Sequence, residues 1–152
     1  MENKKLKELI FTKLQAIIDQ KIIAVNREIE SAKESRNNDT KNSAGDKYET
    51  GRAMAQMELD KNEAQLRRTV KLKKELSLIN IQKKYDKVEF GSLVMTNHEN
   101  YFISFGIGKV AIENTDYYAI SLASPIGQVF LHKKQGDSII FQGREIFIQD
   151  IS

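Results

Sequence analysis

The chain has 152 residues, of which 40% are hydrophobic, enough for one ordinary domain or a small domain with an extended element, and this size argues against a large enzyme core. A formal net charge of +3 is far below the value that alone indicates a nucleic-acid-binding protein. The absence of cysteine excludes disulfides and cysteine-ligated zinc. No apolar run approaches the roughly 20 residues of a membrane span, so we expect a cytoplasmic protein without a membrane partner.

The composition changes near Asp86. Residues 1–86 hold 19 basic and 14 acidic side chains, a net charge of 19 minus 14, or +5, and no proline. Residues 87–152 hold six of the eight glycines, the only proline and clusters of β-branched and aromatic residues. We therefore predict two architectures, with boundaries at 1–86 and 87–152.

Apolar residues recur at helical spacing in two runs of the first part, with some drift near the end of the second run. The first run is Phe11, Leu14, Ile18, Ile22, Val25, Ile29 and Ala32, and the second is Ala55, Leu59, Leu66, Val70, Leu72, Leu76 and Ile79. This spacing places each run on one stripe of a long helix. Neither stripe can be buried within its own helix, so we predict an antiparallel coiled-coil hairpin with its tip near 36–47.

Short segments rich in β-forming residues fill the second part, at 88–96, 101–108, 117–124, 138–141 and 144–151. We predict that they form antiparallel strands, with a tight hairpin turn at Gln142 and Gly143. Ser124 followed by Pro125 has the pattern of an N-cap and a first-turn proline, which predicts a short helix. The fold class is therefore α+β, a helical hairpin followed by a small antiparallel sheet domain with one short helix.

The segment "ISLASPIGQVFLHKKQGDSIIF", Ile120 to Phe141, resembles the C-terminal signature of the bacterial transcript cleavage factors GreA and GreB. "FGSLV", at 90–94, is similar to the first strand of that domain. The resemblance is strong from residue 88 onward and rests only on layout before it. It implies an N-terminal antiparallel coiled coil and a C-terminal domain of the FKBP-like fold.

The resemblance also implies a partner and a mechanism. In the family, the C-terminal domain docks on bacterial RNA polymerase through a Ser-Pro element, which here corresponds to Ser124 and Pro125 with Ser121 nearby. The coiled coil enters the secondary channel, where acidic residues at its tip help to hold a second Mg²⁺ at the polymerase active site. The chain would thus be no enzyme and have no cofactor of its own, and at most it would stimulate transcript cleavage by the polymerase.

The tip of this sequence differs from the family pattern. Aligning Tyr48 with the family's tip tyrosine puts Lys41 and Ala44 where the two acids belong. The acids of this stretch, Asp39, Asp46 and Glu49, lie at displaced positions and are the candidate ligands for a Mg²⁺ shared with the polymerase. Capping is the alternative role of Asp46, because "SAGD" at 43–46 has the spacing of a capping box.

A basic run occupies 67–84. Its members Arg67, Lys71 and Lys74 share one helix face by their spacing of four and three. In a channel factor this face would contact the polymerase or the nascent RNA or DNA. The alternative is an ordinary solvated face of a coiled coil.

Several functions are compatible with the sequence. The leading hypothesis is a monomeric Gre-like factor that modulates transcription elongation or initiation, with weak cleavage or none. The alternatives are a genuine cleavage factor that uses the displaced acids, a prolyl isomerase-like protein and a coiled-coil adaptor. The sequence does not predict whether transcription is activated or inhibited.

Overall fold

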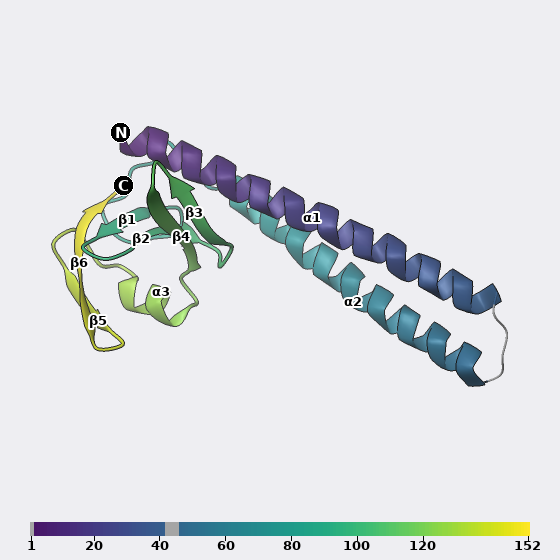
Figure 1. The fold of residues 1–152 in the computed structure, drawn as a ribbon. Coiled ribbons are helices and arrows are strands. Elements are labelled where there is room, and N and C mark those ends of the chain that lie inside the picture. The colour runs from purple at the N-terminus through teal and green to yellow at the C-terminus, as the bar shows by residue number, and fades with distance from the viewer. Residues whose placement is uncertain (1, 42–45) are drawn as a thin grey trace. The chain divides into compact units, whose positions relative to one another are not determined.

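The computed structural model describes residues 2–41 and 46–152, without the side chains of residues 39–41 and 46–48. Two long helices precede six strands and one short helix (Figure 1). The elements are α1 Asn3–Lys41, α2 Asp46–Ser77, β1 Leu93–Thr96, β2 Asn100–Ser104, β3 Gly108–Ile112, β4 Thr115–Ser121, α3 Pro125–Phe130, β5 Ser138–Phe141 and β6 Arg144–Ile151. The predicted helical hairpin, sheet and short helix are therefore confirmed.

The chain forms two compact units. The hairpin unit comprises residues 18–74, and the sheet unit comprises residues 1–17 together with 75–152. The first residues of α1 and the last residues of α2 thus belong to the sheet unit, whereas the sequence places both in the coiled coil. The boundaries of folded units follow the contacts that each residue makes, and a long helix can contribute to two units.

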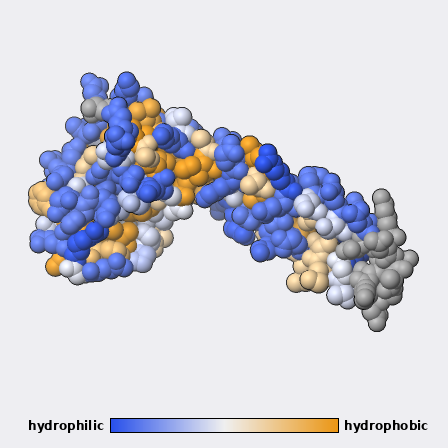
Figure 2. Space-filling model, in the orientation of Figure 1, coloured by the Kyte–Doolittle hydropathy of each residue, from blue (hydrophilic) through white to orange (hydrophobic). Residues whose placement is uncertain are grey.

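Within the hairpin unit, α1 and α2 run antiparallel. Lys73 forms an ion pair with Asp19 at 2.7 Å, while Arg36 donates a hydrogen bond to Gln56 at 3.1 Å, so positions that rise along α1 meet positions that fall along α2. The apolar stripes meet in a core formed by Val25, Ile29, Ala32 and Leu59, with Leu66 packed against it. In the face shown in Figure 2, hydrophilic residues cover much of this unit.

A polar residue interrupts this core. Asn62 of α2 is 2% exposed, and its Nδ2 has no hydrogen-bond partner in the described part of the chain. Near it the two helices border a hollow of about 550 Å³ that small residues line, Ala32, Gly51 and Ala55 among them. Position 62 lies on the apolar stripe, three residues after Leu59 and four before Leu66, so the helical spacing indicates its burial although its residue type does not.

The helices extend further than the polar composition of the tip predicts. α1 continues to Lys41 and α2 begins at Asp46, so most of the stretch 36–47 is helical. Asparagine, aspartate and threonine disfavour a helix by only a few tenths of a kcal/mol per residue, and they do not end one that packing stabilises. The predicted burial of Val70 is wrong, since this residue is 48% exposed.

The sheet has the strand order β3-β4-β2-β1-β6-β5. Four of its five neighbouring pairs are antiparallel, as predicted, but β2 and β4 run parallel, with Phe102 opposite Ala119. The difference arises from β3, which the sequence prediction omits. This strand forms a hairpin with β4 through Glu113 and Asn114, both at positive φ, and thereby reverses the direction in which the chain enters β4.

Two other local predictions are confirmed. Gln142 and Gly143 have φ values of 53° and 74°, as a tight turn between β5 and β6 requires. α3 begins at Pro125 with Ser124 as its N-cap. These features depend on a few consecutive residues, which explains why the sequence indicates them.

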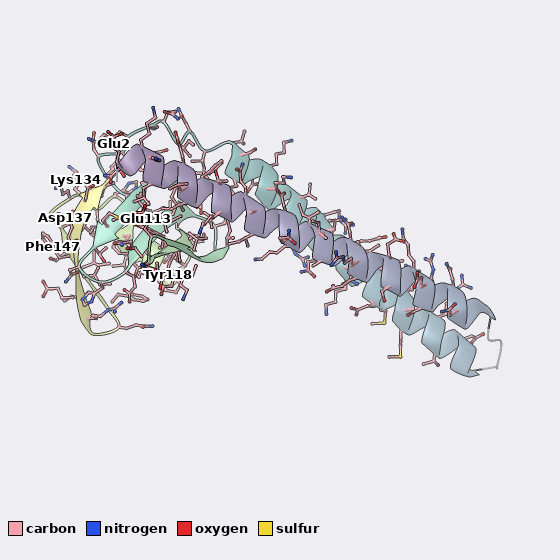
Figure 3. The ribbon with its side chains drawn as sticks, turned by 45° about the horizontal axis from the view of Figure 1, so that its top comes forward. Glu2, Glu113, Tyr118, Lys134, Asp137 and Phe147 are labelled. Carbon is pink, nitrogen blue, oxygen red and sulfur yellow. The ribbon has the colours of Figure 1, made fainter. Side chains whose placement is uncertain are left out.

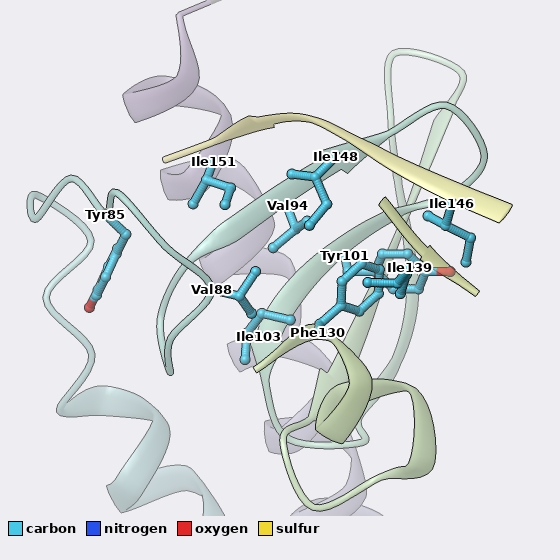
Figure 4. Close-up of a cluster of buried hydrophobic side chains, with 10 residues drawn as sticks. All are labelled: Tyr85, Val88, Val94, Tyr101, Ile103, Phe130, Ile139, Ile146, Ile148 and Ile151. Atoms are coloured by element: carbon cyan, nitrogen blue, oxygen red, sulfur yellow. The ribbon is translucent and has the colours of Figure 1, made fainter. Parts of the chain in front are cut away.

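A cluster of buried apolar side chains lies within the sheet unit (Figure 4). Phe130 of α3 is fully buried and its ring lies 5.2 Å from that of Tyr101 on β2. The core consists of Tyr85, Val88, Val94, Tyr101, Ile103, Phe130, Ile139, Ile146, Ile148 and Ile151. The start of α1 joins this unit, because Asn3 donates to Asp150 at 2.7 Å and Lys13 donates to the carbonyl of Ala111 at 2.6 Å.

Candidate docking site on the sheet unit

The link from β4 to α3, residues 121–127, forms a tight corner that we call the β4–α3 corner. Ser124 Oγ accepts a hydrogen bond from the amide of Gly127 at 3.1 Å and donates one to the carbonyl of Ser121 at 2.6 Å. Ser121 Oγ accepts from the amide of Ala123 at 3.0 Å. Both serines are thus bound within the corner, and their first role is to fix the direction in which α3 leaves the sheet.

At Gly127 the backbone of α3 approaches the backbone of Ser121 and Leu122 closely. A Cβ on Gly127 would lie 2.1 Å from the carbonyl oxygen of Ser121 and 2.8 Å from the Cα of Leu122. Both contacts are with the backbone, which no side-chain rotation can relieve. The glycine of the Ser-Pro-Ile-Gly segment is therefore required so that the first turn of α3 can lie directly against the end of β4.

A shallow groove lies beside the corner, and we call it the tyrosine groove. Its volume is about 290 Å³. Residues from four strands, from α3 and from the β5–β6 turn line it: Glu99, Tyr101, Tyr118, Ile120, Ile126, Phe141, Gln142 and Arg144. Ile120 and Ile126 both belong to the family-like segment at 120–141. Within this segment, Ser121, Ser124 and Gly127 form the corner, and Ile120 and Ile126 line the groove.

Aromatic contacts hold the floor of the groove in place. The ring of Tyr101 lies 6.2 Å from that of Tyr118 and 5.2 Å from that of Phe130. Tyr118 is only half-buried and lies on β4 (Figure 3). Packed rings of this kind present a rigid apolar surface, which lowers the entropic cost of binding a partner.

One end of the groove carries an ion pair. Arg144 donates to both carboxylate oxygens of Glu99, at 2.8 and 3.1 Å, and Tyr101 donates to Glu99 at 3.1 Å. The hydrogen bond from Arg144 lowers the pKa of Glu99. Burial, reinforced by the charge of Glu99, raises the pKa of Tyr101 to about 12. The end of the groove therefore stays charged but internally paired near neutral pH.

The three predicted docking residues lie together at the corner. Pro125 is exposed, whereas Ser121 and Ser124 are half-buried, and their hydroxyl groups form the hydrogen bonds described above. Sequence reasoning missed Glu99, Tyr101, Tyr118, Phe141 and Arg144. Glu99 and Arg144 are 45 positions apart, and only the pairing of distant strands brings them together.

The predicted tip acids are only partly described. Asp39 lies in the last turn of α1 and Asp46 is the first residue of α2, but their side chains lie outside the described residues, as does the predicted cap Ser43. Glu49 is exposed in the first turn of α2. Among the described residues, no group of three His, Cys, Asp or Glu side chains has an arrangement that could hold a metal ion.

The predicted basic face lies in the hairpin unit. Arg67, Lys71 and Lys74 are all exposed on α2. The neighbouring Lys73 forms an ion pair with Asp19 of α1 across the hairpin. The role of the face in contacting nucleic acid or polymerase stays a prediction.

No helix in the described part of the chain is long and apolar enough to cross a membrane. Comparison with protein-family models gives no match, and comparison with curated proteins gives none either. Among solved structures, the chain is similar to the transcription factor Gfh1, with 19% sequence identity and a TM-score of 0.37. That similarity covers 90% of this chain and 92% of Gfh1, and at this TM-score it supports no inference about function.

Proposed function

We propose that this chain is a Gre-like factor that binds bacterial RNA polymerase and modulates transcription. The observation that carries the proposal is the coincidence of the family-like segment with a built surface. Ser121, Ser124 and Gly127 of this segment fix the β4–α3 corner. Ile120 and Ile126 of the same segment line the adjoining tyrosine groove. Ile120 and Ile126 pack against the core of the sheet unit and remain partly exposed in the groove, where a partner can contact them.

In this proposal the two units have separate tasks. The corner and the groove bind the polymerase, and the hairpin enters the secondary channel, as the resemblance implies. Arg67, Lys71 and Lys74 then contact the polymerase or the nascent RNA or DNA through their exposed positions on α2. The protein acts as a monomer in the cytoplasm.

The tip residues favour modulation over strong stimulation of cleavage. Lys41 and Ala44 stand where the family has acids, so two carboxylates are missing from the aligned positions. Asp46, with Asp39 or Glu49, still supplies the carboxylate oxygens that Mg²⁺ prefers. A Mg²⁺ held there would supply activated water for transcript cleavage, and we propose that this contribution is weak or absent.

The docking step is tested by capture of core RNA polymerase on the immobilised full chain. We compare Ile126→Asp, which puts a charge in the groove, with Ile140→Asp, which makes the same change at a position 73% exposed on β5 outside the groove. We expect binding to fall at least tenfold for the first variant and to stay unchanged for the second. Equal binding by the wild type and Ile126→Asp would refute docking through the groove.

The effect on cleavage is tested with a backtracked transcription complex, with and without the protein. We expect little cleavage, together with a changed rate of elongation or initiation. Asp46→Asn separates metal binding from capping, because the amide keeps the shape and the capping ability of the side chain but removes its charge. Strong cleavage by the wild type that disappears in Asp46→Asn would overturn the modulator proposal and assign Asp46 as a metal ligand.

A further inference from the structure

A lysine is buried where the start of α1 meets the segment after α2, within the sheet unit. Lys7 is 2% exposed. Its ammonium donates one hydrogen bond, to the carbonyl of Lys83 at 3.1 Å, and lies 4.9 Å from the centre of the Tyr85 ring. Lysine is seldom fully buried without a carboxylate, so this arrangement calls for an explanation.

In the described part of the chain, no carboxylate forms an ion pair with Lys7. The nearby acids have other partners, since Glu8 accepts a hydrogen bond from Gln82 at 3.3 Å and Asp150 accepts one from Asn3 at 2.7 Å. An ammonium has three N–H donors, and the protein satisfies one of those of Lys7. The positive charge therefore lacks a counter-ion, and burial lowers the pKa of Lys7 to about 8.

Lys7 lines a pocket with a volume of about 300 Å³, which we call the lysine pocket. The other polar residues that line it are Asn3, Lys4, Gln82, Lys83, Lys84 and Ser152. The hydroxyl of Ser152 is buried and has no hydrogen-bond partner in the described part of the chain. The first turn of α1 carries no acidic residue, so the positive end of its helix dipole adds to the positive potential.

We propose that the lysine pocket binds a small phosphorylated anion. Four lysines line the pocket, and one of them, Lys7, is 2% exposed and has no carboxylate ion-pair partner in the described part of the chain. The volume is at the lower end of the range for small-molecule sites, which fits a pyrophosphate or the phosphate groups of a nucleotide. The bound anion supplies the counter-ion that Lys7 lacks and an acceptor for the Ser152 hydroxyl.

The chemistry of the pocket favours phosphate over carboxylate. Lysine is a compact point charge that binds the multiple oxygens of a phosphate from several directions, whereas arginine gives the planar fork that pairs with a carboxylate. No arginine lines the pocket. Four cationic side chains also match the two to four negative charges of a pyrophosphate better than the single charge of a carboxylate.

The test is calorimetric titration of the full chain with sodium pyrophosphate at constant ionic strength. We expect saturable binding of one pyrophosphate per chain. Lys7→Met keeps an unbranched apolar side chain and removes the charged ammonium, and it should weaken binding about tenfold or more. Lys84→Met should weaken it severalfold. Lys5→Met is the matched control, because Lys5 is an exposed residue of the same helix outside the pocket.

Each outcome decides the proposal. Absence of saturable binding up to roughly 10 mM pyrophosphate, or equal weakening by Lys5→Met, would overturn it. Citrate that binds as tightly as pyrophosphate would overturn the assignment to phosphate. Should Lys7→Met fail to melt cooperatively, the comparison of Lys84→Met with Lys5→Met decides the result. The titration contains no polymerase, so its result tests the lysine pocket independently of the proposed function.

Discussion

Replacing Gly127 by alanine tests the reasoning about the β4–α3 corner in the sharpest way. Helix propensity alone predicts that Gly127→Ala stabilises α3 by up to about 1 kcal/mol. The structure predicts the opposite sign. The new Cβ would lie 2.1 Å from the carbonyl oxygen of Ser121, whereas even the closest favourable carbon–oxygen contacts are about 3.3 Å, so the backbone must move by about 1 Å.

The size of the effect follows from what that movement disturbs. Overpacking against a fixed backbone costs about 1–3 kcal/mol. Displacing α3 also weakens the Ser124 cap, at about 1 kcal/mol, and loosens the packing of the fully buried Phe130. After the gain from propensity is subtracted, we expect the free energy of unfolding to fall by about 2–4 kcal/mol.

The measurement is urea denaturation followed by near-ultraviolet circular dichroism of the tyrosines. Four of the five tyrosines belong to the sheet unit, so the signal reports mainly on that unit. Gly106→Ala is the control, because a Cβ there meets no atom within 4 Å, and its free energy of unfolding should change by less than about 0.5 kcal/mol. If Gly127→Ala were as stable as the wild type, the close approach that defines the corner would be wrong.

Three further predictions concern the remaining features. Arg144→Met removes the donor that lowers the pKa of Glu99. In the wild type, the ionised Glu99 stabilises the fold above its unfolded-state pKa of about 4.5, and this stabilisation is lost as the pH falls through the lower folded-state pKa. The wild type should therefore have a slightly higher urea midpoint than Arg144→Met at neutral pH, and this difference should shrink as the pH falls below about 4.5; a constant difference would contradict this account. The unfolded state binds more protons at Lys7 between about pH 8 and pH 10.5, so the stability of the wild type should rise with pH across that window. That rise should be smaller in Lys7→Met and intact in Lys5→Met, which thermal melts at several pH values will show. Ser124→Ala removes the cap of α3 and should cost about 1 kcal/mol, whereas Pro125→Ala should cost less and weaken polymerase capture without loss of cooperative melting. Undiminished capture by the Ser124→Ala and Pro125→Ala double variant would exclude the corner from the interface.

Features that depend on neighbouring residues are predicted well from this sequence. Ser124 and Pro125 identify the start of α3 because capping and a fixed φ are local effects. The apolar stripe from Leu14 to Ala32 identifies α1 because its residues are buried at a period of 3.6, apart from Ile22, which is half-buried. In both cases, the residues that cause the structure are close together in the sequence, so the sequence pattern identifies it.

Features that depend on distant pairing are not predicted. The parallel pairing of β2 with β4 requires β3, a five-residue strand that begins at a glycine. The pair of Glu99 and Arg144 exists only because the link between β1 and β2 and the start of β6 meet in space. Lys7 and Asn62 are buried although both are polar, since burial is decided by what packs around a residue and not by its own type.

The discontinuity of the sheet unit has a consequence for how the protein is made. Its first seventeen residues are synthesised first, yet Lys13 reaches its partner Ala111 across 98 positions and Asn3 reaches Asp150 across 147. During translation, Asn3 and Lys13 must therefore remain without these partners until Asp150 and Ala111 have been synthesised. Such long-range closure slows folding, and it makes the last strand the step that completes the unit. A ribosome stalled before β6 would thus hold a formed hairpin beside an unfinished sheet, and the nascent chain would be a substrate for chaperones and proteases until its final eight-residue strand emerges.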